Sequence, residues 1–323
     1  MKNKILITNK GIHPFLLDRL RQLGFICETD FSSSREELGA KIKNYCGLVM
    51  KSRFTVNKAF FKKAVKLRFL ARVGVGFEHI DVEYAQKKGI KLFLSPEGSR
   101  DAVGEHTLGL LLNLLNKISK ADREIRQGAW FREPNRGIEL KGKTVGIIGF
   151  GNMGRSFAKK ISGLEAKVIA YDKYEKGFGN KYVREVSLKK IFSKTDFLSI
   201  HIPYDADNHY FIDKNFLQQF RKPIYIINTA RGLVLNTEDL VKAIKKGVVL
   251  GAALDVIEYE EQSFESFSKG QLPKAFRYLI QSDRVVLTPH VAGWTEASKL
   301  KHARVIAEKI ERLYFNLQNA GKG

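Results

Sequence analysis

Cysteine is scarce in this chain, and long apolar runs are missing. Its 323 residues include two cysteines, Cys27 and Cys46, whose spacing matches no paired metal-ligand pattern. We therefore expect no metal site, a reduced compartment and two buried structural thiols. Every apolar segment is short and interrupted by charge, so we expect no membrane span. The segment MKNKILITNK reads as a first strand rather than a signal peptide, which predicts a cytoplasmic protein.

Acidic residues are also in short supply, with 34 Asp and Glu against 56 Lys and Arg and a formal net charge of +22. The basic residues occur as dispersed pairs, without a basic block interleaved with aromatics and without a helix-turn-helix or zinc-finger pattern. We favour a lysine-rich solvated surface over nucleic-acid binding, which would require steeply salt-dependent binding to a duplex. The charge would still attract anionic substrates.

Short apolar runs alternate with helical patterns in two series, which predicts an α/β fold with two Rossmann-like lobes built on parallel sheets. The length suits two domains, and 44% apolar residues are enough for a core in each. The strands expected in the first series are residues 4–8, 25–27, 47–50, 68–72 and 90–94, and those in the second are 144–149, 167–171, 196–201, 223–228, 250–255 and 284–288.

Three further segments interrupt this alternation. One long helix is expected from about Asp101 to about Ile125, with Asp101 in its first turn and a leucine face. The segment 258–283 is expected to be a long loop with short helical turns packed by its aromatics. A final helix is expected from Glu296 to about Asn316.

The stretch 144–172 carries the strongest functional pattern, a strand, a glycine turn, a helix, a strand and an acid. Gly149 permits a sharp turn out of the strand, Gly151 leaves space for a pyrophosphate, and Gly154 lets the helix pack close to the sheet. Asp172 lies 23 positions after Gly149, where a carboxylate accepts hydrogen bonds from a ribose diol and repels a 2′-phosphate. The pattern predicts NAD as cofactor, although Lys173 would soften the preference over NADP.

Three polar residues follow strands of the second series, at the sheet edge where such folds bind ligands. Arg231 suits the carboxylate of a 2-hydroxy acid, and His290 suits proton transfer at its hydroxyl. Glu260 would orient the imidazole, but Glu258 and Glu261 stand beside it and spacing alone leaves the choice open. Taken singly, each residue also has an ordinary structural interpretation.

Several motifs together resemble the D-2-hydroxyacid dehydrogenase family over nearly the whole chain. They are the glycine motif with Asp172, RVGVGFEHID (72–81), VGEHTLGLLL (103–112), HIP (201–203), NTARG (228–232), GAALDV (251–256) and TPHVAGWT (288–295). The resemblance implies catalytic roles for Arg231, Glu260 and His290. It selects Glu260 because the family's catalytic glutamate lies five residues after the aspartate of ALDV, here Asp255.

The resemblance also implies binding roles. The backbone at Val75 and Gly76 would bind the substrate carboxylate, and Lys51 would face a substrate phosphate. Residues implied to contact the cofactor are Asn152 and Met153 at the pyrophosphate, Pro203 at the adenosine half, and Thr229, Ala230 and Asp255 along the nicotinamide. The resemblance favours structural roles for His106 and His201.

The family topology implies a substrate-binding domain of residues 1–100 with 296–323 and an inserted NAD-binding domain of residues 101–295. It implies a homodimer through the 101–125 helix and no regulatory domain after the last helix. Two departures affect the substrate assignment, namely Glu261 in place of a common proline and a long 262–283 loop.

We therefore expect an NAD-dependent D-2-hydroxyacid dehydrogenase, with D-3-phosphoglycerate as the preferred substrate hypothesis. Alternatives in the same class are reductases of glyoxylate, hydroxypyruvate or pyruvate. An alternative from another class is a cofactor-sensing binding protein similar to the co-repressors that share this fold.

Overall fold

The computed structural model describes residues 3–260 and 272–320. The chain forms two compact units, one made of Met1–Ser99 and Trp294–Gly323 and the other of Arg100–Gly293. Each unit contains one sheet in which all paired strands are parallel, so the predicted α/β fold with two parallel sheets is confirmed. No helix in the described ranges is long and apolar enough to cross a membrane.

The first unit is a five-stranded sheet in the order β2-β1-β3-β4-β5. Its strands are β1 (Lys4–Ile7), β2 (Ile26–Thr29), β3 (Gly47–Met50), β4 (Phe69–Arg72) and β5 (Lys91–Phe93). Its helices are α1 (Pro14–Gln22), α2 (Arg35–Lys41), α3 (Lys58–Lys63), α4 (Val82–Lys87) and α12 (Glu296–Ala320). Helix α12 packs beside α1, so the chain's last helix completes the first unit.

Strand residues of this unit alternate between two cores, as the two-residue period of a strand requires. Leu6, Leu48 and Leu70 pack on one face with helices α2 to α4. Ile5, Val49 and Ala71 face the other way, against apolar residues of α1 and α12.

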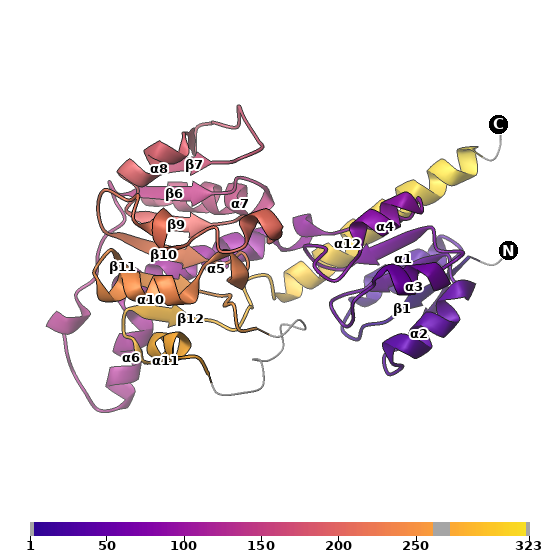
Figure 1. Cartoon of the computed structure of the whole chain (residues 1–323), viewed down its shortest axis with the longest axis horizontal. Coiled ribbons are helices and arrows are strands. Elements are labelled where there is room, and N and C mark those ends of the chain that lie inside the picture. Colours follow the sequence, from indigo (N-terminus) through magenta and orange to yellow (C-terminus); the bar gives the residue numbers. More distant parts are fainter. Residues whose placement is uncertain (1–2, 261–271, 321–323) are drawn as a thin grey trace. The chain divides into compact units, whose positions relative to one another are not determined.

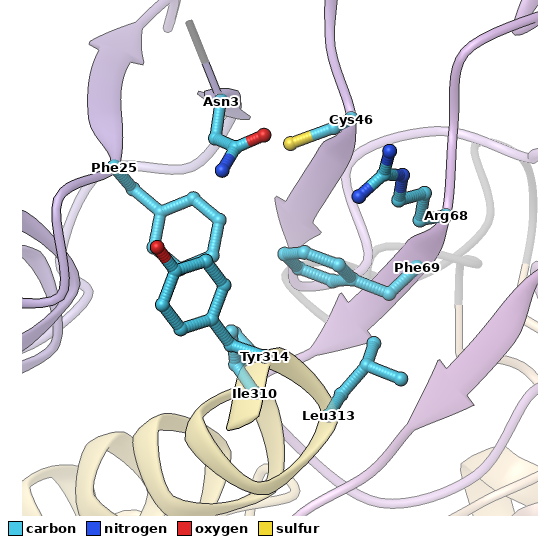
Figure 2. Close-up of a pocket in the computed structure, with 8 residues that line it drawn as sticks. All are labelled: Asn3, Phe25, Cys46, Arg68, Phe69, Ile310, Leu313 and Tyr314. Carbon is cyan, nitrogen blue, oxygen red and sulfur yellow. The ribbon is translucent and has the colours of Figure 1, made fainter. Parts of the chain in front are cut away.

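A small pocket opens at the amino ends of these strands, where α12 crosses them (Figure 2). Its lining residues are Asn3, Phe25, Cys46, Arg68, Phe69, Ile310, Leu313 and Tyr314. Cys46 and Cys27 are free thiols and only partly buried, which corrects the expectation of two buried structural thiols. Burial still raises the pKa of both thiols, so they stay protonated at neutral pH.

The second unit is a seven-stranded sheet in the order β12-β11-β10-β9-β6-β7-β8 (Figure 1). Its strands are β6 (Thr144–Ile148), β7 (Lys167–Tyr171), β8 (Arg184–Glu185), β9 (Phe197–Ile200), β10 (Ile224–Asn228), β11 (Val249–Leu254) and β12 (Val285–Leu287). Helices between them include α7 (Asn152–Ile161), α8 (Leu188–Lys194), α9 (Lys214–Leu217) and α10 (Thr237–Lys245). The chain runs outward from β6 in both directions, so the strand order reverses between β6 and β9, where open sheets of this kind bind ligands.

The prediction of a single helix from Asp101 to Ile125 is wrong. The structure has α5 (Pro96–Asn116) and α6 (Ile118–Arg126), separated by Lys117 in a left-handed conformation with φ of 53°. The side chain of Asn113 accepts a hydrogen bond from the Ser119 N–H at 2.8 Å, which stabilises the start of α6. Because α5 already begins at Pro96, Asp101 lies in its interior rather than in its first turn.

Two other elements differ from the expectation. The segment after Glu258 contains an eight-residue helix, α11 (Lys274–Gln281), which buries Phe276 and Leu279 against the second unit's core. Residues 261–271, including Glu261 and much of the expected loop, lie outside the described residues. The short edge strand β8 was not expected, because two residues give no readable alternation.

Candidate active site

The glycine turn after β6 has the conformations that its sequence requires. Gly149 has a φ of +87°, and a Cβ there would lie 2.7 Å from the His201 carbonyl oxygen. A Cβ at Gly154 would lie 2.2 Å from the Gly149 carbonyl oxygen, so α7 packs against the turn only with glycine at this position. A Cβ at Gly151 would meet no heavy atom within 4 Å, which leaves open space in front of the turn.

Helix α7 begins at this turn without a capping side chain, because its N-cap is Gly151. Asn152 and Met153 stand in its first turn, where backbone N–H groups carry the partial positive charge of the helix. Open space, a bare N-terminus and a glycine at the closest approach together fit a pyrophosphate group.

Asp172 follows β7 and is tied to the same turn. Its Oδ2 accepts the Phe150 N–H at 2.7 Å, and its Oδ1 accepts the N–H groups of Tyr174 and Glu175. Burial alone would raise its pKa, but these three backbone hydrogen bonds hold the pKa of Asp172 below its ordinary value. The carboxylate is therefore ionised at neutral pH. Lys173 lies 3.8 Å from the Asp207 carboxylate.

Other residues predicted to contact the cofactor lie after β9 and β10. Pro203 follows β9, and its carbonyl oxygen accepts the side-chain amide of Asn208 at 3.1 Å. Thr229 and Ala230 follow β10 and are buried. The Thr229 hydroxyl lies 3.0 Å from the Thr107 hydroxyl of α5, which holds this strand end against that helix.

His290 and Glu260 are brought together at the ends of β12 and β11. The imidazole Nδ1 lies 2.6 Å from Glu260 Oε2, while Glu260 Oε1 accepts the Ile257 N–H at 2.5 Å. Both side chains are largely covered, with 23% of His290 and 14% of Glu260 exposed. A carboxylate beside Nδ1 favours the tautomer with its proton on Nδ1. The lone pair is then on Nε2, on the side of the ring away from Glu260, as acid–base chemistry at Nε2 requires.

Glu258, the other candidate that the structure describes, is engaged elsewhere. Its carboxylate accepts the Thr237 N–H at 3.1 Å, at the start of α10. Glu260 is thus the described glutamate that pairs with His290, while Glu261 lies outside the described residues.

Asp255 holds the loop that carries His290, a role that the sequence reasoning missed. Its buried carboxylate accepts the Thr288 hydroxyl at 2.6 Å and the N–H groups of Val291 and Ala292. Although burial alone would raise its pKa, hydrogen bonds from His106, Thr288 and these amides keep the pKa of Asp255 below its ordinary value. The sequence signal for this contact is an acid, Asp255, at the end of the predicted strand that precedes the strand leading into TPH.

His290 itself has a left-handed backbone, with a φ of 54°. Its N–H donates to the Asp255 carbonyl oxygen at 2.7 Å. A histidine in this conformation is uncommon and costs about 1 kcal/mol. The surrounding hydrogen bonds offset this cost and hold the loop in its conformation.

Arg231 follows β10 and begins the short 3-10 turn 232–234. Its Nη1 donates to the Ala230 carbonyl oxygen at 2.8 Å, and its own carbonyl oxygen accepts the Asn228 side-chain amide at 3.0 Å. The guanidinium thus lies against the preceding carbonyl group, and the Asn228 bond fixes the backbone of Arg231.

The residues predicted to contact substrate in the first unit follow β3 and β4. The Lys51 Nζ lies 3.4 Å from the Gly11 carbonyl oxygen and 4.8 Å from the centre of the Trp294 ring. Val75 and Gly76 lie in the loop after β4, where Gly76 has a φ of +88°. Lys51 and the loop with Val75 and Gly76 thus lie at the carboxyl edge of the five-stranded sheet. The pocket of Figure 2 lies at the opposite, amino edge.

The chain is similar to a family of known enzymes. Residues 108–292, more than half of the chain, match the D-isomer specific 2-hydroxyacid dehydrogenase NAD-binding domain. A D-3-phosphoglycerate dehydrogenase of Archaeoglobus fulgidus is 33% identical over 95% of this chain and 56% of its own length. The chain thus spans about half of that relative.

A glyoxylate reductase of Thermofilum pendens is 35% identical over 87% of this chain and 82% of its own length. Among solved structures, a D-lactate dehydrogenase from Aquifex aeolicus, complexed with NAD and lactic acid, superimposes with a TM-score of 0.82 at 25% identity. That match covers 97% of this chain and 96% of the other.

Proposed function

We propose that this chain, which belongs to the D-isomer specific 2-hydroxyacid dehydrogenase family, is an NAD-dependent oxidoreductase of 2-hydroxy and 2-keto acids. In this proposal His290, Glu260 and Arg231 perform the chemistry. The observation that carries this proposal is the 2.6 Å contact between His290 Nδ1 and Glu260 Oε2. It holds one ring nitrogen so that the other exchanges a proton.

The reaction removes a hydride from C2 and a proton from the C2 hydroxyl of the 2-hydroxy acid. The bound nicotinamide ring supplies the hydride acceptor, or the hydride donor in the reverse direction. His290 takes the hydroxyl proton at Nε2 and returns it when a 2-keto acid is reduced. Glu260 stabilises the imidazolium that forms, and Arg231 binds the substrate carboxylate and polarises the C2 oxygen.

We propose NAD over NADP on the basis of Asp172. Its ionised carboxylate lies at the end of β7, where it would accept a ribose diol and repel a phosphate. The residues proposed to hold the cofactor are Gly149, Gly151, Asn152, Met153, Gly154, Asp172, Pro203, Thr229, Ala230 and Asp255. Residues 101–295 would then form the cofactor domain, and residues 1–100 with 296–323 the substrate domain.

The proposed substrate is D-3-phosphoglycerate, whose oxidised form is 3-phosphohydroxypyruvate. Lys51 supports it, because an ammonium group at the carboxyl edge of the sheet suits a phosphate. The Trp294 ring, 4.8 Å from the Lys51 Nζ, stabilises the ammonium group at this edge. The alternative is reduction of glyoxylate or hydroxypyruvate, which the coverage of the Thermofilum relative favours.

A screen of NADH oxidation separates these substrates. The panel holds 3-phosphohydroxypyruvate, hydroxypyruvate, glyoxylate and pyruvate, and the proposal predicts the highest kcat/KM for the phosphorylated acid. Lys51→Met should lower that kcat/KM about tenfold while glyoxylate turnover stays within about twofold. Equal rates for phosphorylated and unphosphorylated acids would contradict the substrate. Cofactor binding without turnover of any acid would favour the co-repressor-like alternative.

We also propose a homodimer formed through the second unit. Helix α6 is amphipathic yet buries no residue, and Ile118 and Ile125 are exposed along it. Trp130 and Phe131 follow in the same segment, with Trp130 79% exposed. A cluster of large exposed apolar side chains is typical of an interface, and a second copy of this unit would cover it.

A further inference from the structure

We propose that Arg72 and Ser95 are positioning residues that pre-organise the loop 73–78 as a backbone anion site for the substrate carboxylate. This inference rests on the proposed function, since it concerns the loop assigned to that carboxylate. It adds two side chains that do not touch the substrate themselves. Both act on the backbone of the loop, from opposite ends.

Arg72 is the last residue of β4 and its side chain is buried, with 5% of the residue exposed. Its Nη1 donates hydrogen bonds to the carbonyl oxygens of Val75 and Gly76, the latter at 2.6 Å. The same atom lies 3.4 Å from Glu78 Oε2, whose side chain is 18% exposed. One guanidinium group therefore contacts two carbonyls and a carboxylate within the six residues that follow the strand end.

The direction of these carbonyls fixes the direction of the amides. In a trans peptide the C=O and the following N–H point to opposite sides of the same plane. Because Arg72 draws in the carbonyls of Val75 and Gly76, the N–H groups of Gly76 and Phe77 are directed away from it. Successive N–H groups on one side of a turn form an anion-binding concavity. The buried guanidinium adds positive charge behind them.

The left-handed conformation of Gly76 makes this arrangement possible. Its φ is +88°, and a Cβ at this position would lie 2.3 Å from Glu78 Oε1. A side chain here would disrupt both the backbone conformation and the Arg72–Glu78 pair.

Ser95 holds the other end of the loop. Its N–H donates to the Gly74 carbonyl oxygen at 2.9 Å, and its hydroxyl accepts the Gly74 N–H at 3.1 Å. The hydroxyl also lies 2.7 Å from Nδ1 of His302, near the start of α12. Burial, together with the positive charges of Lys51 and Arg72, lowers the pKa of His302 to about 4. At neutral pH the imidazole is uncharged, and its Nδ1 and the serine hydroxyl share this hydrogen bond.

This second anchor is packed as closely as the first. A Cβ at Gly98 would lie 2.6 Å from His302 Nδ1, so the ring has no space to rotate away from Ser95 on that side. The loop is thus tied to α12 through a fixed imidazole. A buried charge such as that of Arg72 costs free energy unless it is paired. Because this guanidinium contacts two backbone carbonyls, we infer that it serves to fix the conformation of the loop and not only to fill the core.

The test compares Ser95→Ala and Arg72→Lys with the control Ser99→Ala, which removes another buried serine hydroxyl one helical turn later. KM for the 2-keto acid and KM for NADH are measured separately, together with kcat. Ser95→Ala should raise KM for the 2-keto acid about tenfold, because a buried hydrogen bond is worth about 1 to 1.5 kcal/mol. Arg72→Lys should do the same, because the lysine side chain is one bond shorter and its ammonium group does not reach the position of Nη1. KM for NADH should stay within about twofold.

Binding of oxamate to the NADH-loaded enzyme, measured by calorimetry, separates this inference from the proposed function. If the wild type reduces no 2-keto acid, the proposed function fails. In that case, a loss of oxamate affinity in Ser95→Ala relative to the wild type would still support the loop as an anion site. Wild-type oxamate affinity in both loop variants would overturn the inference, as would a wild type that binds no oxamate. Should Arg72→Lys fail to fold by circular dichroism, Ser95→Ala decides the question.

Discussion

The imidazole Nδ1 of His290 lies 2.6 Å from Oε2 of Glu260, although the two residues are 30 positions apart in the chain. The neighbouring strands β11 and β12 bring them together, because parallel strands present their carboxyl ends at one edge. A partly exposed imidazole held on one side by a carboxylate has the arrangement of a general acid–base group.

Replacement of Glu260 by Gln should lower kcat by about two orders of magnitude, because the imidazolium loses its ionic partner and its tautomer is no longer selected. Single-turnover reduction at saturating NADH measures this. The matched control is Glu258→Gln, which removes a carboxylate two residues away that contacts Thr237 instead. If both variants lose activity equally, the specific role of Glu260 is wrong.

Asp172→Ala should weaken NADH binding and increase the ratio of NADPH to NADH turnover. The carboxylate that repels a 2′-phosphate is removed, and the Phe150 N–H loses its acceptor. The measurement is kcat/KM with each cofactor at fixed 2-keto acid. A wild type that already prefers NADPH would refute the assignment of Asp172.

Acidification should destabilise the protein through His201. Burial lowers the pKa of His201 to about 3, and its Nδ1 has no hydrogen-bond partner among the described residues. The unfolded state therefore takes up the proton first, at about pH 6.5, so stability falls as the pH drops below that value. The loss at pH 5 should be on the order of 2 kcal/mol.

His201→Asn should weaken this pH dependence of Tm between pH 7 and pH 5, because one of two imidazoles with a lowered pKa is gone and His302 accounts for the rest. His209→Gln, at an exposed position, serves as the control and should keep the wild-type slope. An unchanged slope in His201→Asn would show that another group causes the acid lability.

Trp130→Ser should convert the proposed dimer to a monomer, because it removes the most exposed apolar side chain of the α6 segment. Sedimentation velocity of wild type and variant measures the change. Trp294→Ser is a suitable control, since Trp294 is also exposed but belongs to the first unit. A wild type that sediments as a monomer would contradict the dimer.

The sequence was sufficient for the elements whose signals are local. Gly149, Gly154 and Asp172 follow from spacing, because a sharp turn, a close helix and a strand-end acid each require one residue type. The parallel arrangement of the strands also follows from the alternation of strands and helices, whereas the strand order comes from the structure.

Other features depend on tertiary contacts that no local pattern records. The helix break at Lys117 rests on the side chain of Asn113, and helical periodicity alone continues through it. Spacing alone left Glu258, Glu260 and Glu261 equivalent, and only the family resemblance selected Glu260. In the structure Glu258 contacts Thr237, while Glu260 contacts His290. The link from Ser95 to His302 joins residues 207 positions apart.

The most direct test of the account is the turnover of His290→Asn, with NADH binding measured on the same preparation. Asparagine is chosen because it tolerates the left-handed φ of 54° at this position better than alanine does. We expect kcat to fall by about two to four orders of magnitude, while the Kd of NADH stays within about twofold. A variant that binds NADH and turns over 2-keto acid at the wild-type rate would contradict the assignment of His290 as the acid–base group.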